Sequence, residues 1–277
     1  MEASPLSSDT DLRLIKPEAS TPTPEPPGTS RPRRDRPPRT RVVVRPRCAW
    51  YLPCKHVLDF LAALLLSVVG LPLVALAALL VKLTSRGPVF YTQTRVGKDG
   101  RLFQIYKIRT MIHNCESLTG PRWSIPGDPR VTRIGWLLRV THLDELPQLL
   151  NVLRGEMSLI GPRPERPEFV PELERALPAY RQRLTIRPGV TGLAQVQQPA
   201  DSDIDSVRRK LAYDLYYIRN IGPWMDLRLL IGTFFHALGL PFRTLGRLFG
   251  LPTAEHSQDA VKDLLDEPPP ARVRQSA

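Results

Sequence analysis

The feature that most constrains this chain is an uncharged, apolar stretch of 22 residues at positions 60–81. As a helix, such a stretch is about 33 Å long, enough to cross a hydrocarbon core of about 30 Å. A buried helix of a soluble domain is the alternative, but this stretch exceeds what a domain of this size usually buries. We therefore predict a membrane segment that covers residues 55–83.

A Gly-Leu-Pro sequence at residues 70–72 falls near the middle of this segment, where the proline removes a backbone hydrogen bond and bends the helix. Basic residues flank the segment on both sides, so the positive-inside rule gives no orientation. Two arrangements remain open: a re-entrant helix that breaks at Pro72 and returns to the same face, or a kinked helix that crosses once. At a break the freed backbone groups need partners, and Ser67 is a candidate.

Both ends of the chain are predicted to be disordered tails. Ten of the 30 prolines lie within residues 1–50, and residues 31–47 hold eight arginines against one aspartate. We expect a Pro/Arg-rich tail over residues 1–54 and a polar, proline-rich tail over residues 252–277. The net charge of +12 favours anionic partners, which include lipid surfaces, nucleic acid and phosphorylated substrates.

Residues 84–251 remain for a folded domain. Two β-rich runs, 88–96 and 101–110, flank turn-forming residues and predict a β-hairpin. An amphipathic helix is predicted over residues 143–153. Residues 226–251 alternate apolar clusters with basic residues, which indicates helices at a membrane interface or, alternatively, ordinary core packing.

The second strand of the hairpin carries a charge pattern of its own. With a period of two residues, Phe103, Ile105, Lys107 and Arg109 share one face, so two cations lie side by side at the end of the strand. This arrangement suits a phosphate, and solvated surface cations are the equal alternative.

The adjacent acids Asp144 and Glu145 open the helix predicted over residues 143–153. Acidic residues at this end of a helix are often simple caps, and Thr141 could form a capping box with Asp144. The surrounding cations favour instead a site for a diphosphate and a hard metal ion held by oxygen ligands. The cations in question are Lys107, Arg109, Arg130, Arg133, Arg139, Arg163, Arg166 and Arg187.

Five ordered motifs between about Lys55 and Gly239 closely resemble the monotopic phosphoglycosyl transferases, a family of bacterial sugar transferases. They are DFLAALLLSVVGLPLVALAALLVKLTSRGPVFYTQTRVG, FQIYKIRTM, DPRVTRIGWLLRVTHLDELPQLLNVLRGEMSLIGPRPERPEF, RPGVTGLAQV and KLAYDLYYIRN. The resemblance implies an α/β membrane-associated enzyme with a re-entrant N-terminal helix, a small cytoplasmic catalytic domain and interfacial C-terminal helices. It also implies a location at the bacterial cytoplasmic (inner) membrane, with the active site on the cytoplasmic face.

The activity that the resemblance implies is transfer of a sugar 1-phosphate from a UDP-sugar to undecaprenyl phosphate, with release of UMP. This step initiates exopolysaccharide, capsule or O-antigen assembly. The implied partners are the UDP-sugar, undecaprenyl phosphate and membrane lipid, without nucleic acid, and a homo-oligomer is left open. The alternatives are a membrane-tethered basic adaptor without catalysis and a metal-dependent phosphodiesterase acting on sugar nucleotides.

The resemblance also assigns roles to single residues. Asp144 matches the nucleophile that forms a covalent aspartyl phosphosugar, and Glu145 matches the ligand of a required Mg²⁺ ion. Pro72 matches the break of the re-entrant helix. Asp59 matches an acidic position at the membrane entry, where it could pair with Lys55 one turn earlier.

The phosphate contacts that the resemblance implies come from five cations. Lys107, Arg139 and Arg163 match the basic positions of three motifs. Arg109 and Arg187 are weaker matches, and positioning of the following turn is an alternative role for Arg187. The chain departs from the family pattern at His142 and His56, neither of which belongs to the acidic pair.

Overall fold

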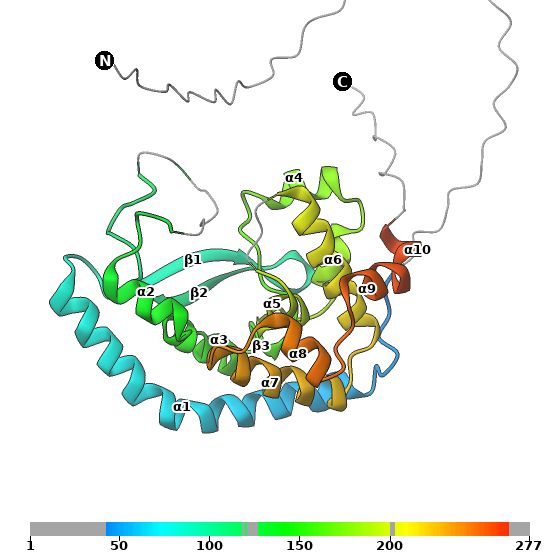
Figure 1. Ribbon diagram of the computed structural model, residues 1–277, viewed down its shortest axis with the longest axis horizontal. Helices are drawn as coiled ribbons and strands as arrows, with labels where there is room; N and C mark the ends of the chain where they lie inside the picture. The colour runs from blue at the N-terminus through cyan, green and yellow to red at the C-terminus, as the bar shows by residue number, and fades with distance from the viewer. Residues whose placement is uncertain (1–42, 118–119, 121–126, 200–202, 266–277) are drawn as a thin grey trace, which may run out of the picture. The chain divides into compact units, whose positions relative to one another are not determined.

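The computed structural model of the chain describes residues 43–117, 120, 127–199 and 203–265 (Figure 1). Most of the predicted N-terminal tail, with its arginine-rich run up to residue 42, lies outside the described residues, as do residues 266–277. The described residues combine helices with two small two-stranded sheets. This mixture confirms the predicted combination of helices and strands.

The strands are β1 (Phe90–Val96), β2 (Leu102–Ile108), β3 (Ser158–Ile160) and β4 (Gly189–Thr191). The α-helices of the described residues are α1 (Tyr51–Thr84), α2 (Arg133–Val140), α3 (Leu149–Leu153), α4 (Val170–Ala176), α5 (Leu193–Gln197), α6 (Ile204–Arg219), α7 (Pro223–Ala237), α8 (Phe242–Leu248), α9 (Ala254–Ala260) and α10 (Lys262–Leu265). The 3-10 helices are η1 (Lys98–Gly100), η2 (Leu143–Gln148) and η3 (Tyr180–Thr185).

Helix α1 contains the predicted membrane segment and extends beyond both of its ends as one helix of 34 residues. Pro72 lies inside it, and the helix bends along its length without splitting in two (Figure 1). Pro72 leaves the carbonyl of Val68 without its usual helical donor. The hydroxyl of Ser67 donates to the carbonyl of Ala63 (2.7 Å), one turn too early to replace that donor. Ser67 therefore does not serve as the partner that we expected at the break.

The two faces of α1 have different environments. One stripe of residues is buried against the rest of the protein: Tyr51, Lys55, Asp59, Ala63, Gly70, Ala77 and Val81. Their spacings of four and seven residues place them on one side of the helix. The other side exposes large apolar side chains, such as Leu65 with 72% of its surface exposed. A helix that is long and apolar enough to cross a membrane thus also packs along the protein, and its outer face is suited to lipid.

The predicted hairpin is confirmed. Strands β1 and β2 pair antiparallel from Phe90 opposite Ile108 to Val96 opposite Leu102. Phe103 and Ile105 of β2 are buried, as their shared face predicts. The hairpin therefore presents the end of β2, with Lys107, toward the segment that carries the acidic pair.

The second sheet brings two distant motifs together. Strands β3 and β4 pair in parallel, and backbone hydrogen bonds join Gly161 to Thr191 (2.9 Å) and Gly189 to Pro162 (3.0 Å). A Cβ atom at Gly189 would lie only 2.1 Å from the backbone nitrogen of Gly161, so only glycine fits this close approach. This close contact between the two backbones fixes the position of the Gly-Pro-Arg-Pro loop, residues 161–164, which carries Arg163.

The predicted C-terminal tail is wrong for its first half, because residues 254–265 form α9 and α10. Helix α9 packs on α6 and α10 packs on α9, and Val261 and Leu264 are buried. The backbone carbonyl of Ala260 accepts a hydrogen bond from Arg219 at the end of α6 (2.7 Å). Apolar residues that are too sparse to suggest a core by themselves become buried because α6 supplies the opposing surface.

Candidate active site

The acidic pair lies in a tight turn between two helices. Helix α2 docks on the end of the hairpin through Gly135, where a Cβ atom would lie 1.9 Å from the carbonyl oxygen of Thr110. After α2, His142 takes a left-handed conformation (φ 56°) and the chain enters the 3-10 helix η2. Residues 143–153 therefore form a 3-10 turn followed by the short helix α3, and the single predicted α-helix is corrected in this respect.

The simple capping explanation for the acidic pair is not supported. The Thr141 hydroxyl donates back to the carbonyl of Leu137 (2.8 Å), and no side chain caps the start of η2. A capping box therefore does not explain why two acidic residues occur at the start of η2.

Glu145 is clamped by two cations from distant segments. Its Oε1 atom accepts from Lys107 Nζ of β2 (2.7 Å) and from Arg163 Nη2 of the Gly-Pro-Arg-Pro loop (2.5 Å). Burial opposes ionisation of Glu145, but Arg163 and Lys107 outweigh it and hold the pKa of this carboxyl well below its usual range. Burial in turn lowers the pKa of the Lys107 ammonium, although Glu145 opposes this effect.

Asp144 has a contrasting environment. Only 6% of its surface is exposed, and within the part of the chain that the structure describes its carboxylate makes no hydrogen bond or ion pair. Burial and the neighbouring negative charge of Glu145 raise the pKa of Asp144 to about 6, against the opposing charges of Lys107, Arg139 and Arg163. A carboxylate without a partner, next to several cations, is free to react with an anionic substrate.

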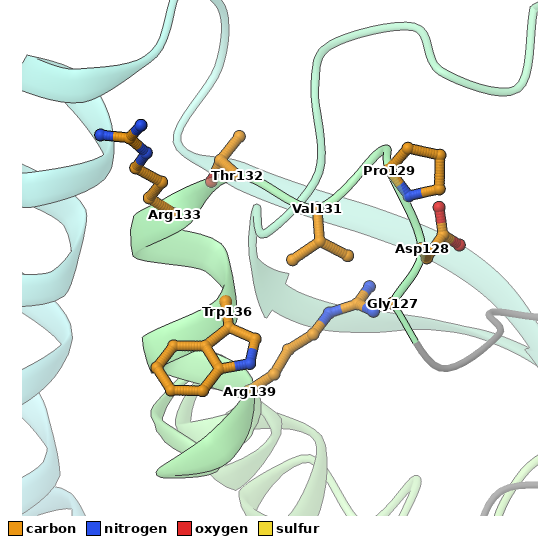
Figure 2. A pocket seen from close by; sticks show the side chains of 8 residues that line it. All are labelled: Gly127, Asp128, Pro129, Val131, Thr132, Arg133, Trp136 and Arg139. Carbon is orange, nitrogen blue, oxygen red and sulfur yellow. The ribbon is translucent and has the colours of Figure 1, made fainter.

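Arg139 connects the acidic pair to a cavity. Its Nε atom donates to the Thr110 hydroxyl (2.9 Å), and its charge acts on Asp144. The cavity, of about 580 Å³, lies between α2 and the segment before it (Figure 2). The residues that line it are Gly127, Asp128, Pro129, Val131, Thr132, Arg133, Trp136 and Arg139.

Two of the five cations predicted to contact phosphate lie elsewhere. Arg109 follows the last residue of β2, and its guanidinium donates to the Ser85 carbonyl (3.0 Å), the Ser85 hydroxyl (2.6 Å) and the Arg86 carbonyl (2.7 Å). It therefore holds the C-terminal end of α1. The Arg187 guanidinium lies beside Gly155, after α3. The structure thus brings Lys107, Arg139 and Arg163 to the acidic pair and places Arg109 and Arg187 outside it.

A second polar cluster, which we call the α1 anchor, joins the start of α1 to the domain. It consists of Tyr51, Lys55, Asp59, Ser158, Tyr217 and Asp226. Lys55 Nζ lies 3.4 Å from Asp59, as predicted, and 2.7 Å from Asp226 of α7. Sequence reasoning found the local pair of one helical turn but missed Asp226, because 171 residues separate it from Lys55.

The donor set at the acidic pair limits which metals it can hold. Among the described residues, no three His, Cys, Asp or Glu side chains converge to form a metal cage. Mg²⁺ does not require one, since it is usually held by one or two carboxylates together with substrate phosphates. Glu145 fits that pattern as the single protein carboxylate. Because Lys107 and Arg163 already neutralise Glu145, the negative charge of a diphosphate would be needed as well.

Comparisons with known proteins agree on one family. The profile of the bacterial sugar transferase family matches residues 50–239. A UDP-N-acetylgalactosamine-undecaprenyl-phosphate N-acetylgalactosaminephosphotransferase of Aeromonas hydrophila is 45% identical over 66% of this chain and 43% of its own length. A UDP-glucose:undecaprenyl-phosphate glucose-1-phosphate transferase of Caulobacter vibrioides is 45% identical over 65% of this chain and 67% of its own length.

An exopolysaccharide production protein of Rhizobium leguminosarum is 42% identical over 66% of this chain and 94% of its own length. The matched region is thus nearly the whole Rhizobium protein, but less than half of the Aeromonas relative. The residues that the family profile matches include the acidic pair and its cations.

Proposed function

The chain belongs to the bacterial sugar transferase family, and from this premise we propose that it transfers a sugar 1-phosphate from a UDP-sugar to undecaprenyl phosphate. The names of the relatives support this reaction class, and the adaptor and phosphodiesterase alternatives are not favoured. The observation that carries the proposal is the unpartnered carboxylate of Asp144 beside Glu145, which two cations clamp. This arrangement suits attack on a phosphorus atom whose negative charge the cations offset.

The proposed reaction has two displacements. The Asp144 carboxylate attacks the β-phosphorus of the UDP-sugar, a phosphorus–oxygen bond to the α-phosphate breaks, and UMP leaves with the electron pair. A phosphate oxygen of undecaprenyl phosphate then attacks the same phosphorus and releases Asp144. In each step negative charge develops on the phosphate oxygens, and Lys107, Arg139 and Arg163 can stabilise it. The covalent intermediate divides one difficult transfer into two easier displacements.

We expect Mg²⁺ to bind with the donor diphosphate, with Glu145 as its protein ligand. When bound, the ion would neutralise charge on the leaving phosphate. Within the protein, Lys107 and Arg163 keep Glu145 ionised and fix its orientation.

The contacts of α1 support a re-entrant helix at the cytoplasmic membrane. Its start is attached to the domain through Lys55 and Asp226, and its end through Arg109 and Ser85. A straight helix of 34 residues would span about 50 Å, so its two ends could not both reach one domain from opposite sides of a bilayer. We propose that α1 dips into the cytoplasmic leaflet and that the active site faces the cytoplasm.

The test is UMP release from a panel of UDP-sugars by membranes that contain the protein, with and without undecaprenyl phosphate and Mg²⁺. Asp144→Asn should lower turnover on the order of a thousandfold, because an amide is a poor nucleophile. Its melting temperature should be unchanged or higher at pH 8, since the fold disfavours the ionised carboxylate.

The matched control is Asp99→Asn, at an exposed residue of the hairpin turn, which should keep full activity. UMP release that needs no lipid acceptor would favour the phosphodiesterase, and full turnover by Asp144→Asn would exclude this residue as the nucleophile.

A further inference from the structure

The cavity beside α2 combines an exposed aromatic ring with cationic side chains. Trp136 contributes its indole and Arg139 its guanidinium to the lining. The two residues are three positions apart on one helix and therefore lie next to each other on its surface, as Figure 2 shows. The volume of about 580 Å³ lies within the range of 300–1,000 Å³ that is usual for small-molecule sites.

Trp136 is not used by the fold. It is 63% exposed, and its indole makes no hydrogen bond or ring contact with any residue that the structure describes. A large, flat and unpartnered ring in a cavity is a ready surface for a planar ligand.

The other residues of the lining favour a polar ligand. Asp128 is held by Arg130 through Nη2 (2.6 Å), which shapes the loop opposite the indole, and Arg133 also lines the cavity. Acyl chains avoid such charged surroundings. The exposed Leu137 and Val140 of the same helix do not line the cavity.

The cavity is also connected to the chemistry. Arg139 lines it and at the same time acts electrostatically on Asp144. A ligand with a planar group at Trp136 and phosphates at Arg139 would therefore place its phosphates against a cation whose charge acts on Asp144.

We propose that this cavity holds the nucleoside part of the donor, with the base stacked on Trp136 and the diphosphate against Arg139. The proposal rests on the proposed function, and it adds a binding site for the nucleobase. Stacking of a base on an aromatic side chain typically changes affinity by roughly fivefold to a hundredfold. Trp136 would thus be a donor-binding residue with no part in the chemical steps.

The experiment uses the full chain in membranes and compares Trp136→Leu with Trp136→Tyr. Trp136→Leu should raise the KM for the UDP-sugar about tenfold, while kcat and the KM for undecaprenyl phosphate stay close to those of the wild type. Trp136→Tyr keeps an aromatic ring and should restore most of the donor affinity. The matched control is Trp224→Leu, because Trp224 is equally exposed on α7 but does not line the cavity.

A second measurement determines how much the base itself contributes to binding. UMP and ribose 5-phosphate, which lacks the base, are compared as inhibitors of the wild type and of Trp136→Leu. The preference for UMP should be large in the wild type and should shrink about tenfold in the variant. An unchanged preference, or weaker membrane retention of Trp136→Leu with normal donor KM, would overturn the proposal and make Trp136 a lipid contact.

The two proposals can fail separately. If the wild type releases no UMP from any UDP-sugar, the proposed function is overturned. If the wild type is active and Trp136→Leu keeps the donor KM, only the nucleobase site is overturned.

Discussion

The candidate active site and the α1 anchor are both built from charged side chains, and they differ in how completely these are paired. In the anchor, Asp226 accepts from Tyr217 on one oxygen and from Lys55 and Tyr51 on the other. In the active site, Glu145 is similarly satisfied, but the adjacent Asp144 has no partner among the described residues. In the anchor the carboxylates are paired, whereas the acidic pair retains one carboxylate, Asp144, without a hydrogen-bond partner among the described residues.

This difference in pairing distinguishes a structural cluster from a reactive one. A buried network in which every charged group is paired fixes the position of the elements that it joins. A buried carboxylate without a partner is destabilising, and proteins retain such groups mainly where they take part in function. The anchor therefore determines where α1 lies, whereas the acidic pair determines what the domain can do. The two clusters should respond differently to mutation and to pH.

The largest expected effect is in the anchor. Asp226→Asn removes the charge opposite Lys55 and leaves a buried ammonium that is poorly compensated, which should lower the free energy of unfolding by about 3–5 kcal/mol. The melting temperature should fall by roughly 10 °C, measured by thermal unfolding in detergent micelles or nanodiscs. The control is Asp263→Asn, whose partner Arg219 lies at the surface. If both variants melt alike, the anchor does not secure α1.

The next effect is the pH dependence of the first displacement. Protonated Asp144 cannot attack, and its pKa is raised to about 6, so kcat/KM for the donor should rise about tenfold per pH unit below that value and level off above it. Glu145 should not contribute to this profile, because its pKa is held well below the usual range. The measurement is single-turnover UMP release between pH 4.5 and 8, with circular dichroism to verify folding. A flat profile between pH 5 and 8 would contradict the raised pKa of Asp144.

The smallest effect tests a peripheral bond of the anchor. The Ser158 hydroxyl lies 2.5 Å from Asp59 Oδ2, and Lys55 is also near that oxygen (3.4 Å). Ser158→Ala should therefore cost about 1 kcal/mol of stability, with turnover unchanged. Urea unfolding with constant m-value would measure it. A loss as large as that of Asp226→Asn would mean that the hydroxyl, and not the ion pair, dominates the cluster.

The sequence predicts those features of the fold that depend on local patterns. The apolar run marks α1, and the alternation of residues 101–110 identifies β2 and the direction of Lys107. The pair of Lys55 and Asp59 follows from helical spacing alone. The family motifs place Lys107, Glu145 and Arg163 in one site, but they predict phosphate contacts for the two cations and not the ion pairs with Glu145.

The features that could not be predicted depend on distant contacts. Arg109 shares the strand face of Lys107, but the end of α1 lies close enough to take its guanidinium. The polar C-terminal region becomes helical only because α6 offers a surface. The left-handed turn at His142 replaces the expected cap with a 3-10 turn. In the first two cases the deciding neighbour is far away in the sequence, where local propensity carries no information.

The length of chain between the two halves of the anchor also has a consequence for biosynthesis. Lys55 leaves the ribosome 171 residues before Asp226, an interval of about 10 to 30 seconds at usual rates of translation. During that time the apolar α1 has no domain to pack on, and its own Lys55 and Asp59 have only each other as partners. The nascent helix therefore needs the membrane, or an insertion factor, before the domain that finally holds it has been made.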